Sequence, residues 1–191
     1  MPVTPPSVLP FILSAAPTLQ GPAWYQLATA ISIAVVGWSV VPGNVTLAGS
    51  VTGMAGSGQV TGKFLLPPIP LPVNSAVASS GMLGPSSIQV STAVGVGVGN
   101  AYSSLCTYVG TSTGAVGSDV SKVVASNPAT LVALLNAAMA SQGIVGPSSK
   151  MLSVGLGTGV AAMFLTGSGT GVSSGPAGPV PGVGVSTSFL L

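Results

Sequence analysis

A threefold internal repeat constrains this 191-residue chain more than any other feature of its sequence. The dipeptide Gly-Pro recurs at residues 21–22, 84–85 and 146–147, so the copies are spaced by 63 and 62 residues. Downstream of each dipeptide the sequence keeps one order of aliphatic and small residues and closes on a valine, in Leu27 to Val35, Val90 to Val98 and Leu152 to Val160. A fixed period of this length is typical of tandem supersecondary units. We interpret the chain as three copies of one unit.

The third copy shows most clearly what a unit contains. Asn127 and Pro128 are typical of a helix start, because asparagine caps free N–H groups and proline suits the first helical position. The next residues follow the spacing of an amphipathic helix, with apolar side chains at Leu131, Leu134, Leu135, Ala138 and Met139. Gly143 then fits the left-handed position that ends many helices.

A second helix is predicted after Gly146-Pro147, from Lys150 to about Leu165, packed antiparallel on the first. Its glycines, Gly155, Gly157 and Gly159, each cost about 1 kcal/mol relative to alanine in a helix. The close approach of a neighbouring backbone would offset that cost. The sequence therefore predicts a helical hairpin in which small residues form the contact.

Each hairpin is followed by a glycine-rich stretch of valine, serine and threonine, most clearly between Val45 and Lys63. Such alternation predicts short strands or extended arms. The predicted fold class is therefore α+β: three tandem repeats, each a helical hairpin followed by a Gly-rich extended or β arm. The predicted boundaries are residues 1–71 for repeat 1, with an N-terminal arm and a polyproline spacer at Pro67 to Pro72, 72–126 for repeat 2, and 127–191 for repeat 3 with an extended C-terminal tail. A threefold ring and a linear array both remain open.

Charged residues make up only 2% of the chain, against about 25% in ordinary soluble domains. They are Lys63, Lys122, Lys150 and Asp119. A free surface with so little charge has little protection against association. It suits a protein covered by other subunits, held in lipid, or assembled once. Nucleic-acid binding is not expected, because there is no arginine and no lysine cluster.

The inventory of side chains excludes most enzyme chemistry. The chain has no histidine, no glutamate and one aspartate, so it lacks an acid–base pair and the usual ligands of zinc or calcium. We interpret Asp119 and Lys122 as a local ion pair or part of a solvated turn, and Cys106 as a small buried apolar residue. The glycine runs near Gly97 and Gly157 lack the context of a phosphate-binding loop. We expect no enzyme, no cofactor, no metal and no small-molecule substrate.

A membrane role is the alternative. Trp24 to Val41 is an uncharged stretch with aromatic residues near both ends, as in spanning helices. Its polar residues and the glycine-rich matching stretches of the other two copies argue against insertion. The apolar run from Val8 to Ala16 lacks the basic residues of a secretory signal and is interrupted by Pro10.

The whole chain resembles structural proteins of tailed-bacteriophage virions, especially small tail or baseplate components. The resemblance rests on the neutral Gly/Ala/Val/Thr/Ser composition, the single cysteine, and the Val-Thr-Gly pattern from Val51 to Lys63. It implies a protein of the virion, assembled in the host cytoplasm, whose partners are other structural subunits of a large assembly.

We expect this assembly protein to be held together by apolar burial and small-residue contacts. The residues expected to carry packing and interaction are Leu27, Ile31, Val35, Val90, Val94, Gly97, Val98, Leu131, Leu134, Leu135, Leu152, Leu156, Gly159 and Val160. The alternative function is a membrane-contacting or pore-forming protein inserted through its Gly/Ala-rich helices.

Overall fold

A computed structural model gives the backbone of residues 8–19, 21–40, 46–54, 57–65, 70–105, 107–112, 116–125, 127–166, 168–174, 178–187 and 189–190, and the side chains of residues 8–19, 21–38, 72–101 and 127–163. The N-terminal arm and Cys106 fall outside the described backbone, and Asp119 and Lys122 outside the described side chains.

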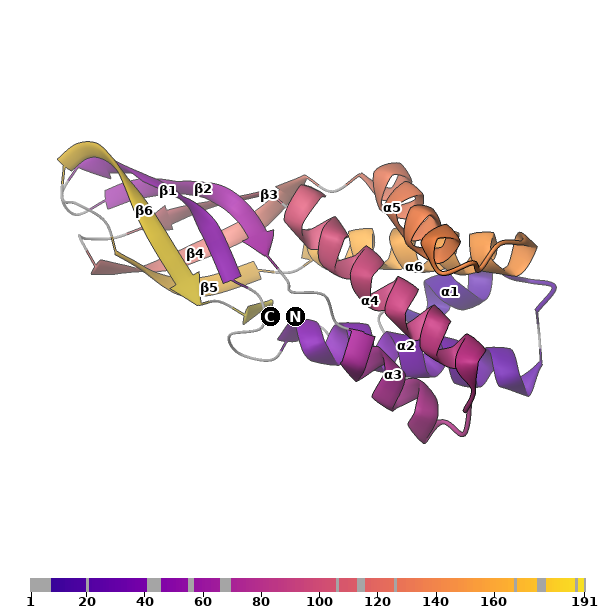
Figure 1. Ribbon diagram of the computed structural model, residues 1–191. Helices are drawn as coiled ribbons and strands as arrows, with labels where there is room; N and C mark the ends of the chain where they lie inside the picture. The colour runs from indigo at the N-terminus through magenta and orange to yellow at the C-terminus, as the bar shows by residue number, and fades with distance from the viewer. Residues whose placement is uncertain are drawn as a thin grey trace.

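The helical part of the fold consists of six helices packed as three hairpins (Figure 1). In each hairpin a shorter helix precedes a longer one. The helices are α1 (Leu9–Ser14), α2 (Pro22–Val40), α3 (Pro70–Ser79), α4 (Pro85–Leu105), α5 (Pro128–Ser141) and α6 (Pro147–Thr166). The prediction of helical hairpins is confirmed, and every Gly-Pro dipeptide begins the longer helix of a hairpin.

The caps predicted for the third hairpin are present. The side chain of Asn127 accepts a hydrogen bond of 3.0 Å from the backbone N–H of Ala129, and Pro128 occupies the first turn of α5. Gly143 has φ of +73°, the left-handed conformation expected at this helix end. The backbone N–H of Ile144 donates to Met139 O at 3.0 Å, which closes the six-residue turn of a Schellman motif.

The second hairpin repeats this turn. Gly81 has φ of +86°, its N–H donates to Ala78 O at 2.9 Å, and the N–H of Met82 donates to Val77 O at 3.4 Å. The first hairpin has no glycine at the matching place. There the N–H of Leu19 donates to Ala16 O at 3.0 Å and a longer turn follows α1. The second and third hairpins therefore share the Schellman turn, and the first hairpin has a different turn.

Two segments differ from the sequence prediction. Helix α3 begins at Pro70, so Pro70 to Pro72 form its first turn and not the end of a polyproline spacer. Prolines fit there because the first helical N–H groups have no partner within the helix. Residues 67–69 lie outside the described part. The apolar run near Pro10 forms the short helix α1, with the proline again in the first turn.

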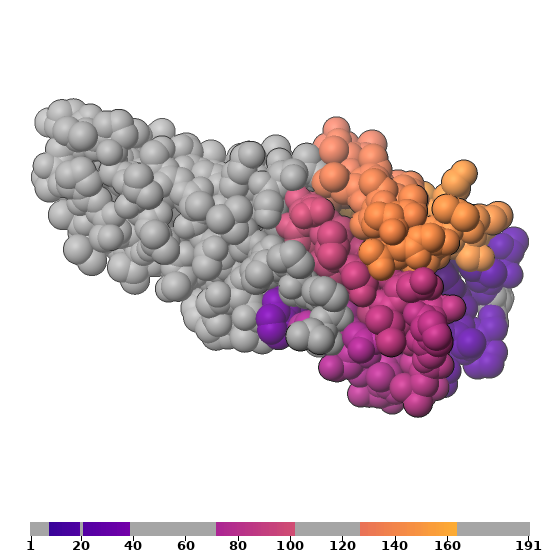
Figure 2. All heavy atoms as spheres, in the orientation of Figure 1, coloured from indigo at the N-terminus to yellow at the C-terminus, as the bar shows by residue number. Residues whose placement is uncertain are grey.

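The three hairpins close into a ring. Each helix contacts the next along the chain, and α1 also packs against α6, which joins the first hairpin to the third. Figure 2 agrees: indigo, magenta and orange atoms of the three units adjoin one another at the helical end. A linear array would leave α1 and α6 apart, so the ring is the arrangement of the helices.

One hydrophobic cluster fills the interior of this ring, with buried residues from all six helices. Ile31 of α2, Val94 of α4 and Leu156 of α6 occupy the same place in their repeats, and all are fully buried. Val35, Val98 and Val160 also share one place in their repeats, and each is at most 1% exposed. The aliphatic residues that recur at equivalent positions of the three copies therefore form the faces by which the three long helices line the core.

The long helices α2 and α4 are each followed by two strands and α6 by three, and these strands extend away from the helical end of the molecule in Figure 1. The strands are β1 (Thr46–Met54), β2 (Ser57–Leu65), β3 (Thr107–Ser112), β4 (Val116–Ala125), β5 (Ser168–Ser174), β6 (Gly178–Thr187) and β7 (Phe189–Leu190). They pair antiparallel in the order β6-β1-β2-β3-β4-β5-β7. In register, Val51 of β1 faces Val60 of β2.

Candidate interaction surface

The residues predicted to carry packing lie inside the chain's own helical ring. Most are buried by 97% or more: Ile31, Val35, Val94, Val98, Leu131, Leu135, Leu152, Leu156 and Val160. The remaining apolar ones, Leu27, Val90 and Leu134, are partly buried and pack against the same cluster. These side chains contact other helices of one chain, so a surface for other molecules has to be sought elsewhere.

The glycines explain how the hairpins approach each other. A β-carbon on Gly97 of α4 would lie 2.7 Å from Leu135 Cδ2 in α5, and one on Gly159 of α6 would lie 2.8 Å from Val8 Cγ1 beside α1. One on Gly157 would lie 3.0 Å from Val132 N in α5. All of these distances are shorter than ordinary contacts of a β-carbon. At the contacts of α4 with α5 and of α6 with α1, the helices can lie this close because the glycines have no side chain.

The long helix of the first repeat differs from the other two at one of these places, because α2 has Ala34 where α4 has Gly97 and α6 has Gly159. A pocket of about 480 Å³ opens between α2 and α3. It is lined by Tyr25, Gln26, Thr29, Ala30, Ile33, Ala76, Ser79 and Ser80.

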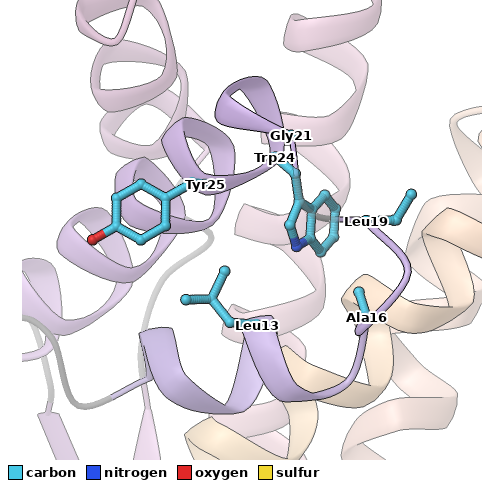
Figure 3. A pocket seen from close by; sticks show the side chains of 6 residues that line it. All are labelled: Leu13, Ala16, Leu19, Gly21, Trp24 and Tyr25. Atoms are coloured by element: carbon cyan, nitrogen blue, oxygen red, sulfur yellow. The ribbon is translucent and has the colours of Figure 1, made fainter.

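A second pocket, of about 270 Å³, lies at the turn of the first hairpin. Its lining is Leu13, Ala16, Leu19, Gly21, Trp24 and Tyr25, and in Figure 3 Trp24 and Tyr25 lie on either side of Leu13. This hairpin has the longer turn without a Schellman glycine. The two pockets therefore occur where the first repeat departs from the other two.

Large apolar side chains are also exposed at the other turns. Leu83 is 81% exposed and Val145 is 79% exposed, and each immediately precedes the glycine of a Gly-Pro dipeptide. Ile88 in the first turn of α4 is 54% exposed. Single exposed apolar side chains therefore lie at the end of the ring where the hairpin turns are, and we call Leu83 and Val145 the exposed tips.

The sequence signalled part of this surface. Trp24 and Tyr25 stand out as aromatic residues, but sequence reasoning assigned them to the end of an apolar helix. Two departures of the first repeat from the other two accompany the pockets: no glycine in the turn, and Ala34 in the long helix where the other copies have Gly97 and Gly159. Both can be read from an alignment of the three copies.

Two further searches cover only the part of the chain that the structure describes. In that part, no group of three or more His, Cys, Asp or Glu residues is placed to hold a metal ion. Nor does any helix there combine the length and the apolar character required to cross a bilayer.

Comparisons with known proteins give no relative. The chain matches no protein-family model, and neither the curated proteins nor the solved structures include a significant match.

Proposed function

We propose that the chain is a non-enzymatic structural protein of a large assembly, in which neighbouring subunits cover its nearly neutral surface. The observation that carries the proposal is the character of the exposed helical surface. Lys150 is the one charged residue among the described side chains, while Tyr25, Ile33, Leu83, Ile88, Val145 and Val154 are between 44% and 81% exposed. A free chain with this surface would associate readily.

The proposed assembly is a virion, with this chain as a phage tail or baseplate component assembled in the host cytoplasm. The support is the resemblance in composition described above, together with a self-contained helical ring. Its partners are then other structural subunits. The proposal includes no nucleic acid, cofactor, metal or substrate.

The same proposal gives a role to the whole repeat. Each hairpin and the strand pair after it would form one unit of an α+β protein, in which the ring supplies rigidity and the glycine-rich arms bind neighbouring subunits. The repeats would span residues 1–71, 72–126 and 127–191. The alternation of hairpins and strands along the chain supports three units, and because α3 begins at Pro70, the second unit starts by residue 70 and not at residue 72.

A membrane-contacting role is the second candidate, and the exposed tips Leu83 and Val145 favour it. The glycine faces of α4 and α6 are occupied by α5 and α1, so they are not free for lipid. Flotation of the purified chain with liposomes tests this candidate. Association with lipid that is lost on replacing both tips by serine would favour the membrane role over the structural one.

The decisive experiment is quantitative mass spectrometry of particles purified from the source. The proposal expects the chain at a fixed stoichiometry relative to the other structural proteins. Its absence from the particles, combined with a monodisperse monomer in solution, would refute the proposal.

A further inference from the structure

Helix α1 is closely fitted to the last helix of the chain. A β-carbon on Gly155 of α6 would lie within 3.0 Å of three backbone atoms of Phe11 and Ile12. One on Gly159 would lie 2.8 Å from Val8 Cγ1. Val8 and Ile12 are fully buried. We call Gly155 and Gly159, with the helix surface between them, the glycine face of α6, and this face leaves no space for an added methyl group beside α1.

The contact of α1 with its own hairpin partner α2 is less complete. The pocket of about 270 Å³ lies between them, with Leu13 and Ala16 on the side of α1 and Trp24 on the side of α2 (Figure 3). Atoms that face such a space lose the dispersion energy of close contact. In addition, no described glycine of this turn has the positive φ that Gly81 and Gly143 have in the other two turns. Helix α1 is therefore held chiefly by α6, and the turn after α1 is the place where the first hairpin can open.

A helix held in this way can pack equally well on a second copy of the chain. Helix α1 has 6 residues, which is too short for a stable helix alone in water, so it forms where a glycine face covers it. Every copy carries the same glycine face, and α1 keeps its contacts with α6 when that helix belongs to another copy. Only residues 15–21 change their path, and as an extended segment they span about 20 Å.

Two properties favour contact between copies. Lys150 is the one charged residue among the described side chains, so two copies approach with little electrostatic repulsion. In a large assembly, the glycine face of a neighbour is also present at a high local concentration, comparable with the roughly millimolar value at which a flexible connection presents the chain's own end. Packing on a neighbour then competes with packing on the same chain.

We propose that two copies of the chain exchange α1, so that α1 of each copy packs on the glycine face of the other copy's α6. Residues 15–21 are the hinge of this exchange. A reciprocal exchange gives a closed dimer, in which both glycine faces are covered. The inference rests on the proposed structural function and deepens it by naming a second copy of the chain as one partner.

Directed disulfide formation between full-length chains tests the inference. One variant carries Val8→Cys and the other Gly159→Cys, and Cys106→Ser removes the one native cysteine from both. Val8 Cγ1 lies 2.8 Å from the β-carbon position of Gly159, close to the separation of about 3 Å between one sulfur of a disulfide and the opposite β-carbon. The two variants are unfolded together, refolded at about 10 μM and at about 1 mM, oxidised, and analysed by mass spectrometry. We expect a disulfide-linked heterodimer whose yield is at least about fivefold higher at the higher concentration.

Two controls show whether the link reports exchange. Val145→Cys replaces Gly159→Cys in the first control, because Val145 is 79% exposed and lies about 20 Å from Gly159 along the helix direction. It reports random collisions and should give only a background yield. The second control is the chain without any substitution, refolded at the same concentrations and examined by native mass spectrometry. It should show the same rise in dimer, which excludes an effect of the introduced cysteines on folding.

A shorter hinge should favour the exchanged dimer. Deletion of Pro17 and Thr18 from the turn after α1 hinders α1 from folding back on its own α6 but not from packing on a neighbour. The ratio of dimer to monomer after refolding should rise at least about tenfold, because short hinges favour exchange. Size-exclusion chromatography with light scattering measures this ratio.

Two results would overturn the inference: an unsubstituted chain that stays monomeric after refolding at about 1 mM, or equal heterodimer yields for Gly159→Cys and Val145→Cys. A dimer that forms without the link between positions 8 and 159 would also overturn it, since its contact would then be made by the exposed apolar side chains. These outcomes are independent of the particle experiment, because a chain can occupy particles at fixed stoichiometry with α1 packed on its own α6.

Discussion

Gly155 of α6 lies so close to Ile12 of α1 that a β-carbon on the glycine would stand 2.5 Å from the isoleucine Cα. The carbonyl oxygen of Phe11 would be 2.7 Å away. Both neighbours are backbone atoms, so a side chain at this position has no space unless α1 moves. This contact joins the first repeat to the third.

Gly155→Ala should therefore destabilise the chain. We expect a loss of about 1–3 kcal/mol through overpacking, despite the better helix propensity of alanine. Urea denaturation followed by circular dichroism measures the loss. Gly37→Ala is the control, because a β-carbon on Gly37 of α2 meets no atom within 4 Å, and it should stabilise the chain by about 0.5–1 kcal/mol. Equal effects of the two variants would contradict the close contact.

Gly97→Ala should cost less than Gly155→Ala. The nearest atom to a β-carbon at Gly97 is Leu135 Cδ2 at 2.7 Å, the end of a side chain that rotates more easily than a backbone moves. The gain in helix propensity of about 1 kcal/mol then offsets most of the strain. Differential scanning calorimetry of both variants gives the order. A greater loss for Gly97→Ala would show that Leu135 has no freedom to adjust.

Ser153→Ala should stabilise the chain by about 1 kcal/mol, because the fully buried Ser153 Oγ has no hydrogen-bond partner in the described part of the chain. The repeat offers its own controls. Ala28 holds the same place in the first copy, and Ser91 in the second donates to Ser87 O at 2.7 Å. Ser91→Ala should be less favourable than Ser153→Ala. Thermal unfolding compares the two, and a destabilised Ser153→Ala variant would indicate a hidden partner.

Asn127→Ala should destabilise the chain by about 1 kcal/mol through loss of the cap of α5. Its side chain satisfies the N–H of Ala129, which has no partner within the helix. Asn100→Ala, at an exposed position in the last turns of α4, removes the same side chain without a cap and should be neutral or slightly stabilising. Chemical denaturation of both variants distinguishes the loss of the cap from the loss of an asparagine side chain elsewhere in a helix. Indistinguishable denaturation midpoints would contradict a stabilising cap at Asn127.

The sequence predicted the hairpins most reliably where local signals agree, as in the third repeat with Asn127 at its start and Gly143 at its end. It predicted α1 poorly, because this helix has only 6 residues, contains Pro10 and ends without a glycine. Periodicity over so short a segment carries little information, and α1 is held mainly by its contact with α6. Pro70 and Pro72 were wrongly assigned to a polyproline spacer, since proline is typical both of helix starts and of spacers.

The partners of the glycines were also beyond the sequence. A glycine in a helix indicates a close neighbour but does not name it. The sequence predicted a small-residue contact within each hairpin, whereas Gly97 and Gly159 lie against helices of the neighbouring hairpins, α5 and α1. The pockets of the first repeat could not be located from the sequence either, because each is lined by residues that two different helices bring together.

Closure of the ring has a consequence for how such a chain can evolve. An open solenoid gains or loses copies at its ends and stays folded, because each copy needs only the one beside it. Here α1 packs against α6, so adding or removing a copy would change the helices on both sides of this closing contact. Within one chain, the contact between α1 and α6 can therefore form only after α6 has been synthesised, although α1 is the first helix of the ring.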